Sequence, residues 1–196
     1  MSLIEANNVE CGNIKLTFDI ESDTMKVFSI KHSYPSEDMY KNGVETILYH
    51  GERTNPNAKV IDSNFRQKVT DEINKANAFE AILVNSNGFI TEGSKSNIFM
   101  IKEDTLYTSP LEDVLPGVTR GRIILLAKSL GISFEEKKIS FEQLENIDAI
   151  FISGTSPKIL PISKVDKINF NVENKIMQKL IKSFDEEIKI YINKFR

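Results

Sequence analysis

The stretch Ile90-Thr91-Glu92-Gly93-Ser94-Lys95-Ser96-Asn97-Ile98-Phe99 places a single carboxylate between an apolar strand and a glycine-serine turn. Glu92 follows Phe89, Ile90 and Thr91, as expected where a buried strand ends at the edge of a site. The default interpretation of such a glutamate is a surface carboxylate at a turn. The pattern of ten residues is far more specific than a short glycine motif, so we take Glu92 as the centre of a candidate site.

Two other segments carry residues suited to the same site. Lys59 lies at the junction between the polar connection from Gly51 to Ala58 and a predicted helix, so its side chain can reach into a cleft. By itself it would be interpreted as an ordinary solvated lysine. Downstream, Leu115-Pro116-Gly117-Val118-Thr119-Arg120 opens a predicted helix. The first N–H groups and the positive dipole end of a helix attract anions, although every ordinary helix start shares these features.

Lys59, the Glu92 motif and Leu115–Arg120 together resemble the class IV aminotransferases, which are pyridoxal-phosphate (PLP) enzymes of fold type IV. This family includes branched-chain aminotransferases, D-amino-acid aminotransferases and aminodeoxychorismate lyases. The resemblance runs from about Gly12 to about Val165. It implies amino-group transfer from an amino acid to a 2-oxo acid through a Schiff base on Lys59. Elimination of pyruvate, as in aminodeoxychorismate lyase, is the alternative reaction.

The same resemblance assigns a role to each candidate residue. Glu92 would keep the pyridine nitrogen of PLP protonated, because a positive ring stabilises negative charge that develops on the substrate. Lys59 would bind the cofactor and then serve as general base and acid. The remaining implied contacts are Leu115 against the ring, Val118, Thr119 and Thr155 at the phosphate, and Gly154, Thr155 and Ser156 at the substrate carboxylate; no metal is implied.

Two features depart from the family pattern. Many relatives have a tyrosine five residues after the lysine, and this chain has Asn64 at that position. Family members also begin with a smaller domain that supplies an arginine to the phosphate and several substrate contacts. Residues 1–196 therefore resemble the large C-terminal domain alone, as a single domain. An inert domain that binds PLP weakly or not at all is consequently a second hypothesis, and a structural interaction module is the weakest.

Periodicity predicts a mixed α/β fold, classed as α+β in some schemes. Strands are predicted at 13–20, 25–31, 44–49, 80–85, 97–101, 105–108 and 149–153, from polar and apolar alternation at 13–20 and from apolar runs at 80–85 and 149–153, with Asn87-Gly88 turning 80–85 back into Phe89 and Ile90. Apolar residues at helical spacing predict helices at 60–77, 118–130 and 172–195, and the capping-box pair Ser140 and Gln143 predicts a short one. Residues 32–43 are predicted to form a loop. We expect the sheet to curl into a partial barrel with flanking helices, as in the large domain of fold type IV.

Composition narrows the classes of function. A chain of 196 residues that is 40% hydrophobic can build a core. A formal net charge of -3 with scattered lysines and arginines indicates neither a nucleic-acid nor a membrane-surface partner, and no apolar run is long enough to span a bilayer. Cys11 is the only cysteine and His32 and His50 are the only histidines, which argues against a disulfide or a metal centre. We expect a cytoplasmic protein with small-molecule substrates, and the resemblance implies a homodimer.

Overall fold

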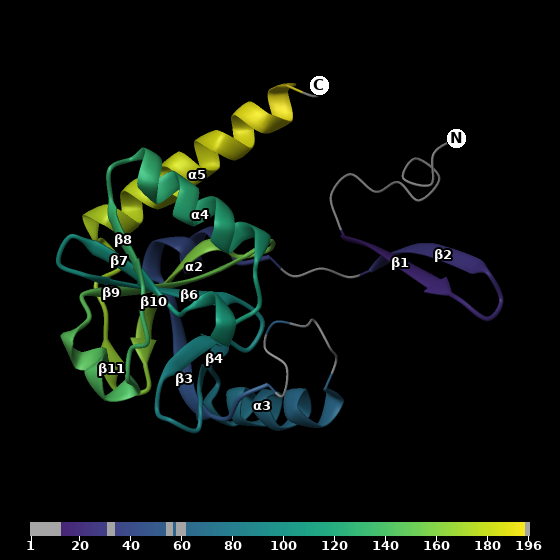
Figure 1. Ribbon diagram of the computed structural model, residues 1–196, viewed down its shortest axis with the longest axis horizontal. Coiled ribbons are helices and arrows are strands. Elements are labelled where there is room, and N and C mark those ends of the chain that lie inside the picture. The colour runs from purple at the N-terminus through teal and green to yellow at the C-terminus, as the bar shows by residue number, and fades with distance from the viewer. Residues whose placement is uncertain (1–12, 31–33, 54–56, 58–61, 195–196) are drawn as a thin grey trace. The chain divides into compact units, whose positions relative to one another are not determined.

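The computed structural model describes residues 13–30, 34–53, 57 and 62–194, and Figure 1 labels the helices and strands that they form. The chain divides into two units, Met1–Tyr34 and Pro35–Arg196. The described part of the first unit is a hairpin, and the second unit contains the other described strands and helices.

The hairpin of the first unit consists of β1 (Asn13–Asp19) and β2 (Thr24–Ile30), paired antiparallel. Its turn is organised by the Asp19 carboxylate, which accepts hydrogen bonds from the N–H groups of Glu21 and Ser22. The strands predicted at 13–20 and 25–31 are confirmed over the described residues. The register sets Leu16 opposite Val27, so both side chains lie on the same face of the hairpin.

A single mixed sheet forms the centre of the second unit. Its strands follow the order β5-β4-β3-β10-β9-β6-β7-β8, and β11 pairs with β10. The pairs β3–β4, β3–β10 and β7–β8 are parallel, and the other pairs are antiparallel. The strands are β3 (Val44–His50), β4 (Glu80–Val84), β5 (Ile90–Gly93), β6 (Asn97–Lys102), β7 (Thr105–Thr108), β8 (Ser133–Glu136), β9 (Ala149–Gly154), β10 (Lys158–Val165) and β11 (Ile168–Asn169).

The sheet curls until its two ends meet. Ile90 at the start of β5 donates its N–H to the carbonyl of Ile139 at 2.9 Å, and Phe141 donates to the carbonyl of Gly88 at 3.0 Å. Residues 139–141 follow β8 and lead into the 3-10 helix η2 (Phe141–Asn146), so the last strand of the sheet is joined to the first. The expected partial barrel built from a mixed sheet is therefore confirmed.

Alternate residues of the central strands enter different cores, as the period of a β-strand requires. Met100 and Ile150 belong to the core on one face. Phe99 and Phe151 point to the opposite face, where their rings stack with centroids 5.0 Å apart. The helices α4 (Val118–Ser129) and α5 (Lys175–Lys194) cover this second face, whereas α3 (Ser63–Ala76) packs on β3 and β4 (Figure 1).

Several helix boundaries agree with their sequence signals. Gly131, at a φ of 68°, follows α4 and confirms the predicted stop. Ser140 and Gln143 form the predicted capping box at the start of η2. The long C-terminal helix begins at Lys175 rather than 172, because the Asn174 side chain accepts from the N–H groups of Ile176 and Met177 and caps the helix there. The start predicted for the helix at 60–77 lies outside the described residues, and α3 is described from Ser63.

The prediction of a loop at 32–43 is wrong for half of those residues. Residues Glu37–Asn42 form a short helix, α2. Ser36 caps it by accepting from the N–H of Met39 at 3.3 Å, and Gly43 ends it at a φ of 74°. Two turns of helix are too short to show the apolar period on which the sequence analysis relied.

The strands β8, β10 and β11 were absent from the sequence predictions. Pro161 explains the largest omission, because a proline inside a run usually argues against a strand. Here Pro161 lies opposite Phe151 of β9, and the ladder continues on both sides of it.

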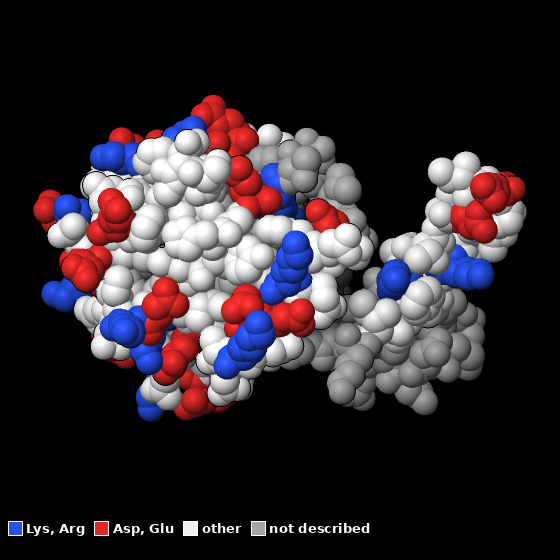
Figure 2. All heavy atoms as spheres, turned by 90° about the horizontal axis from the view of Figure 1, so that it is seen from below, with Lys and Arg blue, Asp and Glu red and all other residues white. Residues whose placement is uncertain are grey.

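Basic and acidic side chains are mixed on the surface. On the face shown in Figure 2, lysine and arginine side chains are interspersed with aspartate and glutamate. None of the described helices is both long enough and apolar enough to cross a membrane.

Candidate functional site

Glu92 is a buried carboxylate on β5, with 4% of its side chain exposed. One oxygen, Oε1, lies 3.2 Å from Nε of Arg53. The other, Oε2, accepts the N–H of Leu115 at 3.2 Å. Burial raises the pKa of the Glu92 carboxyl above its ordinary value, while the Arg53 charge and the Leu115 N–H oppose that rise and the nearby Glu80 adds to it. A buried, partly compensated acid of this kind is typical of functional sites.

Glu80 is a second buried carboxylate, at the start of β4. Its Oε1 accepts the backbone N–H of Lys95 at 2.6 Å and the hydroxyl of Ser96 at 2.9 Å. A Cβ on Gly93 would collide with this oxygen and with the Ser96 hydroxyl. Burial raises the pKa of the Glu80 carboxyl, and its hydrogen bonds to the turn oppose that rise. Glu80 therefore holds the turn that follows Glu92, and only glycine fits where the turn closes.

The loop before α4 connects Glu92 to the start of that helix. Leu115 donates its N–H to Glu92, and its carbonyl accepts from Nδ2 of Asn97 at 2.9 Å and from the N–H of Gly117 at 2.8 Å. A Cβ on Gly117 would collide with Oδ1 of Asn97. The structure thus brings two of the predicted site residues, Glu92 and Leu115, into direct contact.

The first turn of α4 presents open donors. Its N-cap, Gly117, supplies no side-chain hydrogen bond, and the first N–H groups of any helix lack partners inside the helix. Val118 is 83% exposed. Within the described residues, the Thr119 hydroxyl makes no hydrogen bond. This helix start can therefore offer both backbone N–H groups and a hydroxyl to an anion such as phosphate.

Gly154 ends β9, and Thr155 and Ser156 begin the turn that follows it, beside the same region. In the β6–β9 ladder Asn97, which holds Leu115, lies opposite Ser153. Thr155 is exposed, and neither its hydroxyl nor that of Ser156 finds a hydrogen-bond partner in the described part of the chain. The predicted second group of donors thus follows the strand adjacent to Asn97.

Two contacts hold the residues that directly follow Ser156. The Tyr40 hydroxyl donates to the carbonyl of Pro157 at 3.1 Å, and Nζ of Lys158 lies 2.7 Å from Oδ1 of Asp185. The end of the turn and the start of β10 are therefore anchored to α2 and α5.

Lys59 lies outside the described residues, so its expected position opposite Glu92 stays a prediction. Asn57, two residues earlier in the chain, donates from Nδ2 to the carbonyls of Leu111 at 2.7 Å and Val114 at 2.9 Å. Both carbonyls lie in the segment that leads to Leu115, and that of Val114 directly precedes it. Asn64, which replaces the tyrosine of many relatives, is exposed in the first turn of α3.

Arg53 and Glu80 were not identified from the sequence. Arg53 stands in a polar connection without periodicity, and Glu80 opens an apolar strand. One available signal was chemical: a carboxylate predicted to be buried requires a cation or several donors. The connection between Gly51 and Lys59 contains a single arginine.

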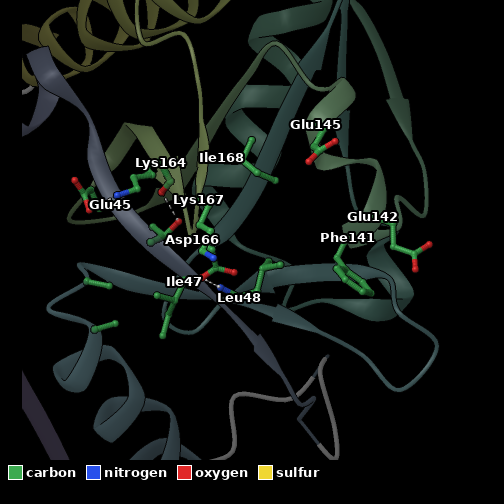
Figure 3. A pocket seen from close by; sticks show the side chains of 13 residues that line it. Glu45, Ile47, Leu48, Phe141, Glu142, Glu145, Lys164, Asp166, Lys167 and Ile168 are labelled. Atoms are coloured by element: carbon green, nitrogen blue, oxygen red, sulfur yellow. Dashed lines mark hydrogen bonds and ion pairs between the residues drawn. The ribbon is translucent and has the colours of Figure 1, made fainter.

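Two pockets lie away from these residues. The larger, of about 750 Å³, lies between β3, the turn from β10 to β11, and η2 (Figure 3). Figure 3 shows Asp166 and Lys164 on one side of it and Phe141 on another; Asp166 accepts the N–H of Leu48 at 3.3 Å. The second pocket, of about 460 Å³, includes His50 and Phe141 in its lining. Neither lining, as far as the described residues show it, contains a predicted site residue. No group of three or more metal-ligating side chains occurs in the described residues either.

Comparison with known proteins places this arrangement in context. The family model described as "Amino-transferase class IV" matches residues 1–165. The D-alanine aminotransferase of Bacillus licheniformis is 31% identical over 132 residues, which are 66% of this chain and 46% of that protein. The branched-chain-amino-acid aminotransferase of Escherichia coli K12 is 34% identical over 143 residues, which are 69% of this chain and 46% of that protein.

A solved structure gives the same result for the fold. The crystal structure of a putative branched-chain amino acid aminotransferase from Thermotoga maritima superposes with a TM-score of 0.80 at 27% identity. The match covers 93% of this chain and 68% of that one. The chain spans about half the length of the curated relatives that it matches.

Proposed function

Because this chain belongs to the class IV aminotransferase family, we propose that it is the large, PLP-binding domain of such an enzyme. In this proposal it transfers an amino group from an amino acid to a 2-oxo acid. The hydrogen bond between Leu115 and the buried Glu92 carries the proposal, because it joins an acid to the loop that opens an anion-binding helix start. The basic nitrogen of the PLP ring would match the acid Glu92, and the phosphate of PLP would match the helix start of α4.

The residues fit PLP by the chemistry of their donors and acceptors. Glu92 would accept a hydrogen bond from the pyridine nitrogen, and the half-buried Leu115 would pack against the ring. The N–H groups of Val118 and Thr119 and the hydroxyls of Thr119 and Thr155 would hold the phosphate. When bound, PLP supplies an electron sink that stabilises negative charge at the substrate Cα.

The chain's own residues would carry the protons of the reaction. Lys59 would bind the cofactor, and, once the substrate amine has displaced it, would take a proton from the substrate Cα and return one to C4′ of the cofactor. Glu92, as a carboxylate, would keep the proton on the ring nitrogen. Gly154, Thr155 and Ser156 would orient the substrate carboxylate.

Covalent labelling tests this proposal. Purified protein is mixed with PLP, the visible absorbance band of the lysine-bound cofactor is recorded, and borohydride then makes the linkage permanent for peptide mass analysis. We expect the label on Lys59 and none in Lys59→Ala, while Lys68→Ala, which removes an exposed lysine of α3, labels normally. Absence of a label at saturating PLP would favour the inert-domain hypothesis, and a label on another lysine would overturn the role of Lys59.

A product assay separates the two candidate reactions. Amino acids are supplied with a 2-oxo acid acceptor, and in parallel aminodeoxychorismate is supplied alone. We expect a new amino acid from the first mixture and no pyruvate from the second; pyruvate release alone would establish the lyase alternative. A homodimer and a cytoplasmic location are also proposed from the family, and sedimentation of the purified chain tests the first.

A further inference from the structure

Arg53 contacts both the acid of the candidate site and the turn that follows it. Its Nε lies 3.2 Å from Oε1 of Glu92, and its Nη2 donates to the carbonyl of Ser94 at 2.7 Å. The side chain is 16% exposed, so this ion pair is largely removed from water. Two nitrogens of one planar guanidinium therefore fix the position of the acid relative to the turn.

The segment that carries Arg53 is itself held in place. Just before it, Gly51 donates its N–H to the carbonyl of Val84 at 2.8 Å and so extends the parallel ladder of β3 and β4. The guanidinium therefore reaches Glu92 from a segment whose backbone is tied to β4 two residues before Arg53.

The contact with Arg53 opposes the groups that favour protonation of Glu92. In the described residues, the groups that act on its carboxylate are Arg53, the Leu115 N–H and the second carboxylate, Glu80. Burial and Glu80 both favour the protonated acid. Of the groups that favour the ionised form, Arg53 alone carries a full charge. An acid that lost this cation would face a buried environment with a like charge nearby.

We propose that Arg53 is a positioning residue of the site, which keeps Glu92 ionised and oriented so that the carboxylate can hold the proton of a bound pyridine ring. The claim about the bound pyridine ring rests on the proposed function. The claim that Arg53 ionises and orients Glu92 concerns only residues of this chain. Arg53 leaves lone pairs of the carboxylate open, because Nε and the Leu115 N–H occupy one direction on each oxygen and a carboxylate accepts about four hydrogen bonds.

A purely structural role for Arg53 is the competing interpretation. The bond to the Ser94 carbonyl alone would tie the connection to the turn and would not affect the charge of Glu92. The two interpretations differ in what Arg53→Gln does to the ionisation of Glu92, since a glutamine keeps a neutral hydrogen-bond donor but carries no charge. Arg53→Lys keeps the charge and loses the two-point geometry.

The first measurement uses the protein without cofactor. Carboxyl-labelled glutamate is incorporated, the signal of Glu92 is assigned as the one missing in Glu92→Gln, and its titration is followed by NMR. We expect Arg53→Gln to raise the pKa of Glu92 so that proton binding tightens roughly tenfold or more. Arg53→Lys should give a smaller rise, and Arg66→Gln, which removes an exposed arginine of α3, should give none.

The second measurement adds PLP. We expect Arg53→Gln to bind PLP roughly tenfold more weakly and to show a displaced pH titration of the bound-cofactor absorbance, with Arg66→Gln unchanged. If PLP fails to bind the unaltered protein, the proposed function fails, while the NMR titration still decides whether Arg53 ionises Glu92. An unchanged Glu92 titration in both Arg53→Gln and Arg53→Lys would overturn the inference. Should Arg53→Gln not fold, as judged by circular dichroism, Arg53→Lys decides by the same criterion.

Discussion

Glu80 and Glu92 are two buried carboxylates on adjacent strands, and they differ in where their partners come from. Glu80 accepts from Lys95 and Ser96, which belong to the turn that follows β5. Glu92 contacts Arg53 from the connection after β3, and Leu115 from the loop before α4. Among the described residues, the acid whose hydrogen-bond partners all lie in one turn stabilises that turn, whereas the acid where distant segments converge marks the site. Burial alone therefore does not identify a functional carboxylate.

The comparison predicts its largest effect for Glu92→Gln. An amide cannot hold the ring nitrogen protonated as a carboxylate does, so we expect kcat for amino transfer to fall roughly a hundredfold. Borohydride labelling of Lys59 should persist, because the linkage to the lysine does not require the acid. The matched control is Glu173→Gln, which removes an exposed carboxylate and should leave kcat unchanged. Equal rates for Glu92→Gln and the unaltered protein would contradict the assignment.

A smaller effect, on stability, is expected at Gly93, which follows Glu92 in the chain and packs against Glu80. Gly93→Ala forces a Cβ against Glu80 and Ser96, so we expect the free energy of unfolding to fall by about 1–3 kcal/mol. Denaturant-induced unfolding measures it. Gly121→Ala is the control, because its Cβ would meet nothing within 4 Å inside α4, and there an alanine should stabilise by about 0.5–1 kcal/mol. Equal changes at both glycines would show that the turn is not closed on Glu80.

The smallest effect is expected for Glu80→Gln, and it depends on pH. A folded-state pKa raised above the ordinary 4.5 means that the native protein binds more protons than the unfolded chain. The free energy of unfolding should therefore decrease as pH rises from about 4.5 to the raised value. Glu80→Gln removes this share of the decrease, and since the amide oxygen still accepts from the turn, we expect a change of about 1 kcal/mol or less.

The pH series separates the two acids. Glu92 titrates in the same direction, so part of the decrease should survive in Glu80→Gln and disappear only when both acids are replaced. Unfolding curves recorded between pH 4 and pH 8 provide the measurement. A decrease that is the same with and without Glu80 would mean that its burial does not perturb its ionisation.

Much of the fold was predictable because its strands are short apolar or alternating runs and its long helices α3 and α5 repeat their apolar residues at helical spacing. Strands at 97–101, 105–108 and 149–153 agree with β6, β7 and β9 within a residue. The short helix α2 was missed because six residues are too few to show an apolar period, and β10 was missed because Pro161 argues against a strand. The candidate site was predictable only through motifs, and the family match bears out the resemblance that those motifs indicated.

By itself, the sequence indicated the family, the mixed curled sheet and the segments that carry Glu92, Leu115 and Thr119, since motifs and apolar patterns are visible in the order of residue types along the chain. Only the tertiary structure decided which segments meet. The pairing of Arg53 with Glu92, the bond from Leu115 to Glu92, and the closing of the turn on Glu80 join residues from different strands and loops. Such contacts arise from the curl of the sheet, which brings distant parts of the chain together at a buried position where each charge must find a partner.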